Sequence, residues 1–280
     1  MAHNTMITEA AILSITRSFE STAEVKALFL AGSYGFGIQD RFSDIDLVVV
    51  TSDPGSGEFI SKCRTAIDQI EEVVLWRVHD SDVVRVSSIT SGWLRLDMIL
   101  VSPGQIESRV RDSLSRQGLR TLFDKERISE MLPSSTDNRP IQPCRTQWQF
   151  SEFIRILGLL PLTIGRENFL NAITGVTYLR NLLIDLMIAE TAAPNKGGAL
   201  NMHRGLTDAQ IEILYSLTLP QPDRDSIIAA NLRFASEYMP RGRTLATRLG
   251  IVWPESFEIA TWRHLQDELA ITPVYEVPSC

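Results

Sequence analysis

The pattern of hydrophobic and polar positions divides the chain into two halves. Up to about residue 132, short apolar runs typical of β-strands stand among helical segments, whereas from about Gln147 most apolar positions recur at helical spacing. Between the halves, Leu132–Cys144 contains three prolines and paired serines, the composition of a connecting loop. We therefore predict two domains, residues 1–132 and residues 145–280.

The first half is predicted to mix helices with strands. Runs rich in β-branched and other apolar side chains indicate strands, and apolar residues three or four apart indicate helices. In chain order we predict a helix at Glu9–Phe19, strands at Val25–Ala31 and Ile45–Thr51, a helix at Glu58–Ile70, strands at Val73–Val78 and Trp93–Val101, and a helix at Gly104–Ser115. This mixture makes the first half α+β or α/β.

The second half is predicted to be a helical bundle. Its segments of helical spacing are separated by proline and glycine, which interrupt helices. These segments are Trp148–Leu160, Asn168–Glu190, Thr207–Leu217 and Arg224–Tyr238.

Charge and hydropathy restrict the partners of the chain. Acidic residues number 34 against 27 basic ones, and the net charge of -7 gives no electrostatic reason to expect nucleic acid as a partner. Met1–Ser21 lacks the pattern of a secretory leader, and the apolar stretch Phe169–Ala189 is interrupted by Asn171, Arg180 and Asp185, which disfavours a membrane span. We expect a cytoplasmic protein without membrane contact.

Cysteine and histidine show no pattern of a disulfide framework or a zinc site. The three cysteines are isolated and odd in number, and the four histidines are scattered without metal-ligand spacing. Free thiols are expected, and any metal site should be built from oxygen ligands.

A glycine-rich turn between the first two predicted strands is the first feature with chemical meaning. Gly32, Gly35 and Gly37 fall within six residues. Glycine allows positive φ and lets backbone N–H groups approach an anion closely, which suits phosphate binding. A plain hairpin-like connection would also explain the turn.

Two aspartates at the start of the second predicted strand add to this feature. Asp44 and Asp46 are two residues apart, and the period of two in a strand sends both side chains to one face. Like charges so placed repel unless a cation, hydrogen bonds or water compensates. Magnesium prefers oxygen ligands, and a pair of such ions is suited to phosphoryl transfer. A solvated aspartate pair is the alternative.

The whole segment, Gly-Ser, three residues, Gly, five residues, Ser-Asp-Ile-Asp-Leu, resembles the signature of the DNA-polymerase-β-like nucleotidyltransferase superfamily. The resemblance implies an α+β fold: a mixed sheet with flanking helices, followed here by the helical domain. It also implies that Gly32 and Ser33, with the signature residues Gly37 and Ser43, bind the triphosphate, and that Asp44 and Asp46 bind the metals. A third carboxylate is implied on a later neighbouring strand.

Asp97 suits the third position because it lies in the predicted strand Trp93–Val101 among apolar residues. A carboxylate there needs a metal or a basic partner. Pairing with Arg95 or Arg85 for structural reasons alone is the alternative. The competing acids Asp80 and Asp82 fall in a predicted turn.

The helical second half resembles that of the lincosamide and aminoglycoside nucleotidyltransferases, which transfer AMP or another nucleotidyl group to a drug hydroxyl. This resemblance implies a substrate-binding role for residues 145–280 and an acidic general base, for which Glu167 is the first candidate and Glu152 the second. The simpler alternative for both is an ordinary solvent-facing residue at a helix start, where the helix dipole favours a negative charge. Cations that could neutralise the triphosphate are Arg41, inside the motif, and Arg180, Lys196 and Arg204.

Together these features predict an ATP-using, magnesium-dependent enzyme with two metal ions. It would transfer AMP, or the nucleotidyl group of another nucleoside triphosphate, to a small-molecule hydroxyl and release pyrophosphate; an antibiotic is one candidate acceptor. Transfer to a protein or tRNA, and a non-catalytic antitoxin-type role, are the alternatives. The sequence leaves a homodimer open.

Overall fold

The computed structural model describes residues 2–106, 114–134, 143–191 and 199–275. The chain divides into two compact units, Met1–Arg139 and Pro140–Cys280. Each unit has its own hydrophobic core and is described by itself below.

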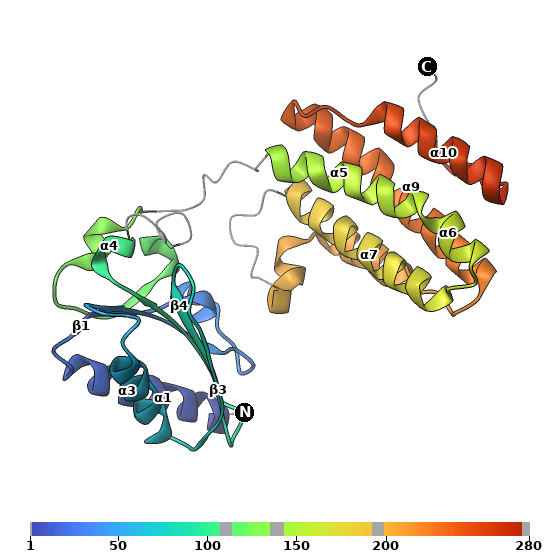
Figure 1. The fold of residues 1–280 in the computed structure, drawn as a ribbon. Helices are drawn as coiled ribbons and strands as arrows, with labels where there is room; N and C mark the ends of the chain where they lie inside the picture. Colours follow the sequence, from blue (N-terminus) through green and yellow to red (C-terminus); the bar gives the residue numbers. More distant parts are fainter. Residues whose placement is uncertain (1, 107–113, 135–142, 192–198, 276–280) are drawn as a thin grey trace. The chain divides into compact units, whose positions relative to one another are not determined.

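A mixed sheet forms the centre of the first unit (Figure 1). In the described residues it has six strands in the order β3-β4-β5-β2-β1-β6. Only β2 and β5 run parallel, and the other neighbours are antiparallel. The strands are β1 (Val25–Leu30), β2 (Ile45–Thr51), β3 (Val73–His79), β4 (Val84–Thr90), β5 (Arg95–Val101) and β6 (Arg120–Asp124). The predicted α+β class is confirmed.

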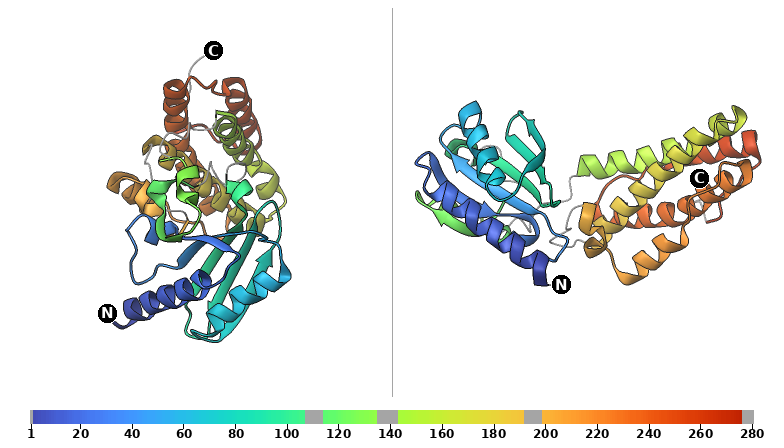
Figure 2. Two further views of the ribbon diagram at one scale, coloured as in Figure 1. Left: turned by 90° about the vertical axis from the view of Figure 1, so that its left-hand side faces the viewer. Right: turned by 90° about the horizontal axis from the view of Figure 1, so that it is seen from below.

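Helices cover the two faces of this sheet unequally (Figures 1 and 2). Helices α1 (Ala2–Glu20) and α3 (Gly57–Asp68) pack on one face, where alternate strand residues such as Leu47 and Val49 are buried. On the other face Val48 and Val50 pack with residues that follow β5 and β6, including Ile106, directly after the short helix α4 (Pro103–Gln105), and Ile128 of η3 (Ile128–Met131). A turn η2 (Arg116–Gly118) precedes β6. The alternation of side chains along each strand therefore determines on which face of the sheet a residue packs.

The sequence predicted most elements of the first unit but missed two strands. Strand β4 carries Arg85, Ser87 and Ser88 among its apolar residues, and β6 is a short edge strand, so neither has a strong apolar pattern. The predicted strand at Trp93 begins two residues later, at Arg95. Of the predicted helix Gly104–Ser115, residues 107–113 lie outside the described part.

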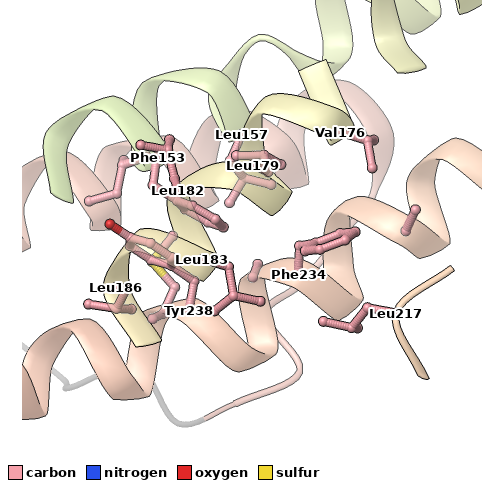
Figure 3. Packing of buried hydrophobic residues seen from close by; sticks show 14 of the residues in the cluster. Phe153, Leu157, Val176, Leu179, Leu182, Leu183, Leu186, Leu217, Phe234 and Tyr238 are labelled. Carbon is pink, nitrogen blue, oxygen red and sulfur yellow. The ribbon is translucent and has the colours of Figure 1, made fainter. Parts of the chain in front are cut away.

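The second unit is built of helices. They are α5 (Pro143–Gly158), α6 (Leu160–Gly165), α7 (Phe169–Thr191), η4 (Ala199–Gly205), α8 (Asp208–Ser216), α9 (Arg224–Leu249) and α10 (Glu255–Leu269). Their apolar faces form one core, in which the rings of Phe153 and Tyr238 stack with centroids 3.7 Å apart (Figure 3). The predicted helical character of this half is confirmed.

Helix α9 corrects one prediction. The sequence ended this helix at Tyr238 because Pro240 follows, yet the helix continues through Pro240 to Leu249. Proline removes one backbone hydrogen bond and normally kinks or ends a helix. Here buried residues on both sides, Met239 and Leu245 among them, hold the helix in place by packing. Helices α6 and α10 were not predicted.

Helix α7 is long and apolar enough to cross a membrane by length and composition, and half of its most apolar window is buried. It contacts α5, α6 and α9 within the second unit. A buried helix of a folded bundle meets the same two criteria.

Candidate active site

Three aspartates converge on the sheet face that α1 and α3 leave uncovered. Asp46 of β2 and Asp97 of β5 are direct partners in the parallel register, and Asp44 immediately precedes β2. One carboxylate oxygen from each of the three residues lies within 4.8 Å of the others, and all three residues are half-buried. The structure thus brings together the three carboxylates that the sequence singled out. Such an all-oxygen set suits a hard divalent cation.

The electrostatics of this triad are unfavourable without a cation. Burial, together with the charges of Asp44 and Asp97, raises the pKa of the Asp46 carboxyl from 3.8 to about 6, and the charge of Arg95 opposes this shift. A bound divalent ion would supply the opposite charge that the three carboxylates need.

Arg95 is a residue of the site that the sequence-based prediction did not include as functional. Its Nη1 lies 3.7 Å from Asp44 Oδ2, and its Nη2 donates a hydrogen bond of 2.7 Å to the carbonyl oxygen of Phe42. The sequence suggested a structural pair with Asp97, but the ion pair formed is with Asp44. The available signal was its spacing, because Arg95 lies two residues before Asp97 and so shares its face of β5.

The glycine-rich segment begins with a single helical turn, α2 (Gly32–Gly35), within the connection between the antiparallel strands β1 and β2. Gly32 has φ +54°, and a Cβ added to it would overlap the Asp46 carboxylate. The Ala31 amide also donates to the Asp46 carbonyl oxygen at 2.9 Å. The absence of a side chain at Gly32 therefore lets the backbone turn directly beside the triad.

Ser33, the residue after Gly32, has a hydroxyl with unsatisfied hydrogen bonding. Its Oγ is buried and has no hydrogen-bond partner among the described residues. A buried hydroxyl without a partner is costly, so native proteins rarely leave one. Gly35 packs against the backbone of Gly118, which fixes the turn from behind. A fixed turn with an unused hydroxyl beside a carboxylate triad is suited to a phosphate held with its cation.

The remaining signature residues have roles within the segment before β2. Ser43 Oγ accepts from the Asp40 amide at 3.0 Å and donates to Asp40 Oδ1 at 3.2 Å, so it closes a turn. Arg41 is exposed and lies over the Phe42 ring, 4.2 Å from its centroid. Gly37 has φ +68° with open space around it. Their contact with a triphosphate stays a prediction.

The candidate bases of the second unit differ in their surroundings. Glu152 accepts two hydrogen bonds of 2.7 Å from Arg155, and this pairing lowers the pKa of its carboxyl. Glu167 is exposed in the turn between α6 and α7, with φ +49°. Glu167 is therefore the more available carboxylate.

The other predicted cations are dispersed. Arg180 is half-buried on α7, Arg204 is exposed on η4, and Lys196 lies outside the described residues. Among the described residues of the second unit, Arg180 and Arg204 are not brought together at one site.

A separate hollow of about 450 Å³ lies between α1 and α3. Ser18, Phe59 and Lys62 are among its lining residues. It opens on the sheet face opposite to the triad, because the strand residues under α1 and α3 alternate with those that flank Asp46. It is not part of the carboxylate site.

Comparison with known proteins is consistent with this chemistry. Residues 11–102 match the family model described as "Nucleotidyltransferase domain", a range that contains the glycine turn and the three aspartates. No curated protein matches the chain.

Two solved structures show a remote likeness. An aminoglycoside 6-adenyltransferase from Bacillus subtilis has 13% identity and a TM-score of 0.42, over 90% of this chain and 95% of its own. A nucleotidyltransferase-like protein from Exiguobacterium sibiricum has 16% identity and the same TM-score, over 94% of this chain and 88% of its own. The substrate in the first name is a property of that protein.

Proposed function

We propose that this enzyme transfers AMP from ATP to a hydroxyl group of a small molecule, because residues 11–102 match the model of the nucleotidyltransferase domain. The observation that carries the proposal is the convergence of three carboxylates beside a glycine turn with an unused buried hydroxyl. The carboxylates and the glycine turn thus provide groups for metal binding and for phosphate binding at the same site.

The carboxylates of Asp44, Asp46 and Asp97 fit magnesium and would hold it. The proposed reaction uses two such ions. Bound magnesium supplies charge neutralisation at the transferring phosphate and its leaving group. The raised pKa of Asp46 is the cost of keeping these carboxylates together before the cation binds. Arg95 offsets part of this cost through its pair with Asp44.

The glycine turn would bind the triphosphate. Its backbone passes next to Asp46 at Gly32, and the Ser33 hydroxyl is available to donate to a phosphate oxygen. Hydrogen bonds to a charged phosphate are about twice as strong as neutral ones. Residues 32–37 would therefore position the phosphate chain, with Arg41 and Ser43 at its margin.

The proposed reaction forms one bond and breaks one at the α-phosphorus. The acceptor oxygen bonds to the α-phosphorus, the bond from this atom to the bridging oxygen of the β-phosphate breaks, and pyrophosphate leaves. The acceptor proton passes to a carboxylate. We propose Glu167 rather than Glu152 for this role, because the Glu152 carboxylate already accepts two hydrogen bonds from Arg155. A general base of this kind contributes about 10²- to 10⁴-fold.

A small acceptor is proposed on two grounds. The second unit, to which we assign acceptor binding, is a helical bundle similar in pattern to those of the antibiotic nucleotidyltransferases. The net charge of -7 disfavours tRNA, whose binding depends on many phosphate contacts. Aminoglycosides and lincosamides are the acceptors to test first, and the cytoplasm is the proposed location.

The test is pyrophosphate release from each of the four nucleoside triphosphates with magnesium, in the presence of a panel of aminoglycosides, lincosamides and other polyhydroxylated molecules. We expect release that depends on one acceptor class, is highest with ATP, and is lost in Asp46→Asn. Asp80→Asn, an exposed acid on the loop after β3, serves as the matched control and should retain activity.

Each alternative has its own result. Release that requires a protein or tRNA would replace the small-molecule acceptor. Triphosphate binding without turnover, together with a co-purifying protein, would favour a non-catalytic binding partner.

A further inference from the structure

Trp93 combines two properties that packing does not explain. Its side chain is 74% exposed although tryptophan is the largest apolar residue. Its backbone has φ +64°, a left-handed conformation that costs a non-glycine residue free energy and that glycine adopts freely. Strained conformations of this kind cluster at ligand-binding sites.

The turn that carries Trp93 is firmly held. Thr90 Oγ1 donates to Glu71 Oε2, and the Ser91 amide donates to the Glu72 carbonyl oxygen at 2.8 Å. The Trp93 amide donates to the Thr90 carbonyl oxygen at 2.9 Å and closes the turn. The indole is thus displayed from a rigid support, which lowers the entropic cost of binding a ligand.

This turn leads directly into the carboxylate site. Trp93 lies two residues before Arg95 and four before Asp97, so at most about 13 Å of chain separates it from Asp97. Phe42, also exposed at 69%, lies two residues before Asp44, and Arg95 joins the two segments through Asp44 and the Phe42 carbonyl oxygen. Two exposed aromatic residues therefore precede the two strands that carry the triad.

We propose that Trp93 forms the stacking surface for the nucleobase of the bound nucleoside triphosphate. This inference rests on the proposed function, because the phosphates must lie at the triad for the base to reach the start of β5. A flat indole matches a flat heterocycle, and every base has a π-face on which to stack.

A flat, uncharged base suits this position. The Glu71 carboxylate accepts from Thr90 Oγ1 in the turn that carries Trp93, and Arg95, two residues after Trp93, pairs with Asp44, so charges of both signs lie near the indole. Stacking of a neutral base on an aromatic ring does not depend on the sign of these charges. The shape and exposure of the indole therefore assign Trp93 to the nucleotide.

The test compares a ligand that has a base with one that has only the phosphates. Binding of magnesium ATP and of magnesium tripolyphosphate is measured by calorimetry for the wild type, Trp93→Gly and Trp93→Phe. Glycine suits φ +64°, so Trp93→Gly removes the ring without straining the turn. Trp148→Ala, which removes an indole that is 53% exposed on α5, is the control.

We expect Trp93→Gly to weaken ATP binding about 5- to 100-fold, which corresponds to the loss of one stacked base. Trp93→Phe should retain most of the affinity, tripolyphosphate binding should be unchanged in both variants, and Trp148→Ala should match the wild type. Unchanged ATP binding in Trp93→Gly, equal weakening of both ligands, or a rise in acceptor KM alone would overturn the assignment. If the wild type binds neither ligand, the proposed function itself fails.

Discussion

The backbone of Gly32 lies so close to Asp46 that one methyl group at residue 32 would overlap the carboxylate oxygen Oδ2. The glycine turn and the metal-binding strand therefore behave as one unit. Any side chain at residue 32 must displace either the turn or the carboxylate.

Gly32→Ala should therefore strongly reduce nucleotidyl transfer while the protein still folds. Both the clash and φ +54° oppose the substitution, and we expect a loss of at least about 100-fold in kcat/KM, because displacement of a catalytic group by about 1 Å has this effect. Gly250→Ala, at the end of α9, is the matched control, because its φ is +64° but no atom lies within 4 Å of the added Cβ. Similar losses of activity in both variants would show that backbone conformation, and not the contact with Asp46, is responsible.

Asp46→Asn should stabilise the metal-free protein at high pH while it removes activity. The pKa of Asp46 in the folded state, about 6, lies above its ordinary value of 3.8, so ionisation of this group between about pH 4 and pH 6 lowers the free energy of unfolding. After allowance for solvent screening, the loss above pH 6 is about 1–2 kcal/mol.

The measurement is urea unfolding of the wild type and Asp46→Asn at pH 4 and pH 8, with chelator and with excess magnesium. The variant should be more stable than the wild type at pH 8 with chelator, and the difference should vanish at pH 4. Magnesium should stabilise the wild type more at pH 8 than at pH 4. A variant that is less stable at pH 8 without metal would contradict this account.

Asp97→Asn, like Asp46→Asn, should weaken binding of the metal ion. Asp97 is the register partner of Asp46, so its carboxylate shares any ion that Asp46 binds. Binding of Mn²⁺, followed by electron paramagnetic resonance, should weaken at least about tenfold, by analogy with the loss of even an outer partner of a metal ligand. Asp80→Asn should leave Mn²⁺ binding unchanged, and equal weakening in both variants would point to net charge instead.

In the second unit, Glu258→Ala should be strongly destabilising. Glu258 is fully buried, pairs with Arg243, and accepts hydrogen bonds of 2.7 Å from Trp253 Nε1 and from the Tyr275 hydroxyl. Removing one partner of a buried ion pair leaves the other charge uncompensated, which costs about 3–5 kcal/mol. Thermal unfolding should show the loss, whereas Glu255→Ala, at an exposed position in the first turn of the same helix, should change stability by no more than about 0.5 kcal/mol.

Local sequence determined the elements that surround the site and two of its three carboxylates. The apolar run Ile45–Thr51 is a strand by its own composition, and its period of two places Asp44 and Asp46 together without any distant contact. The helical spacing of the second half likewise identified its main helices. Strands β4 and β6 were not predicted, because the mixed composition of β4 and the edge position of β6 weaken the apolar pattern by which strands are recognised.

Only the tertiary structure decided what each of these residues contacts. Asp97 meets Asp46 because β5 returns to lie parallel to β2 after β3 and β4 have formed, a pairing over about 50 residues that local pattern does not encode. The same holds for Gly32 against Asp46, for Arg95 against Asp44 and for the unpartnered hydroxyl of Ser33. Helix α9 passes through Pro240 for a related reason, since burial on both sides outweighs the lost hydrogen bond. Periodicity and composition act along the chain, whereas contact, burial and charge pairing depend on distances that exist only after it has folded.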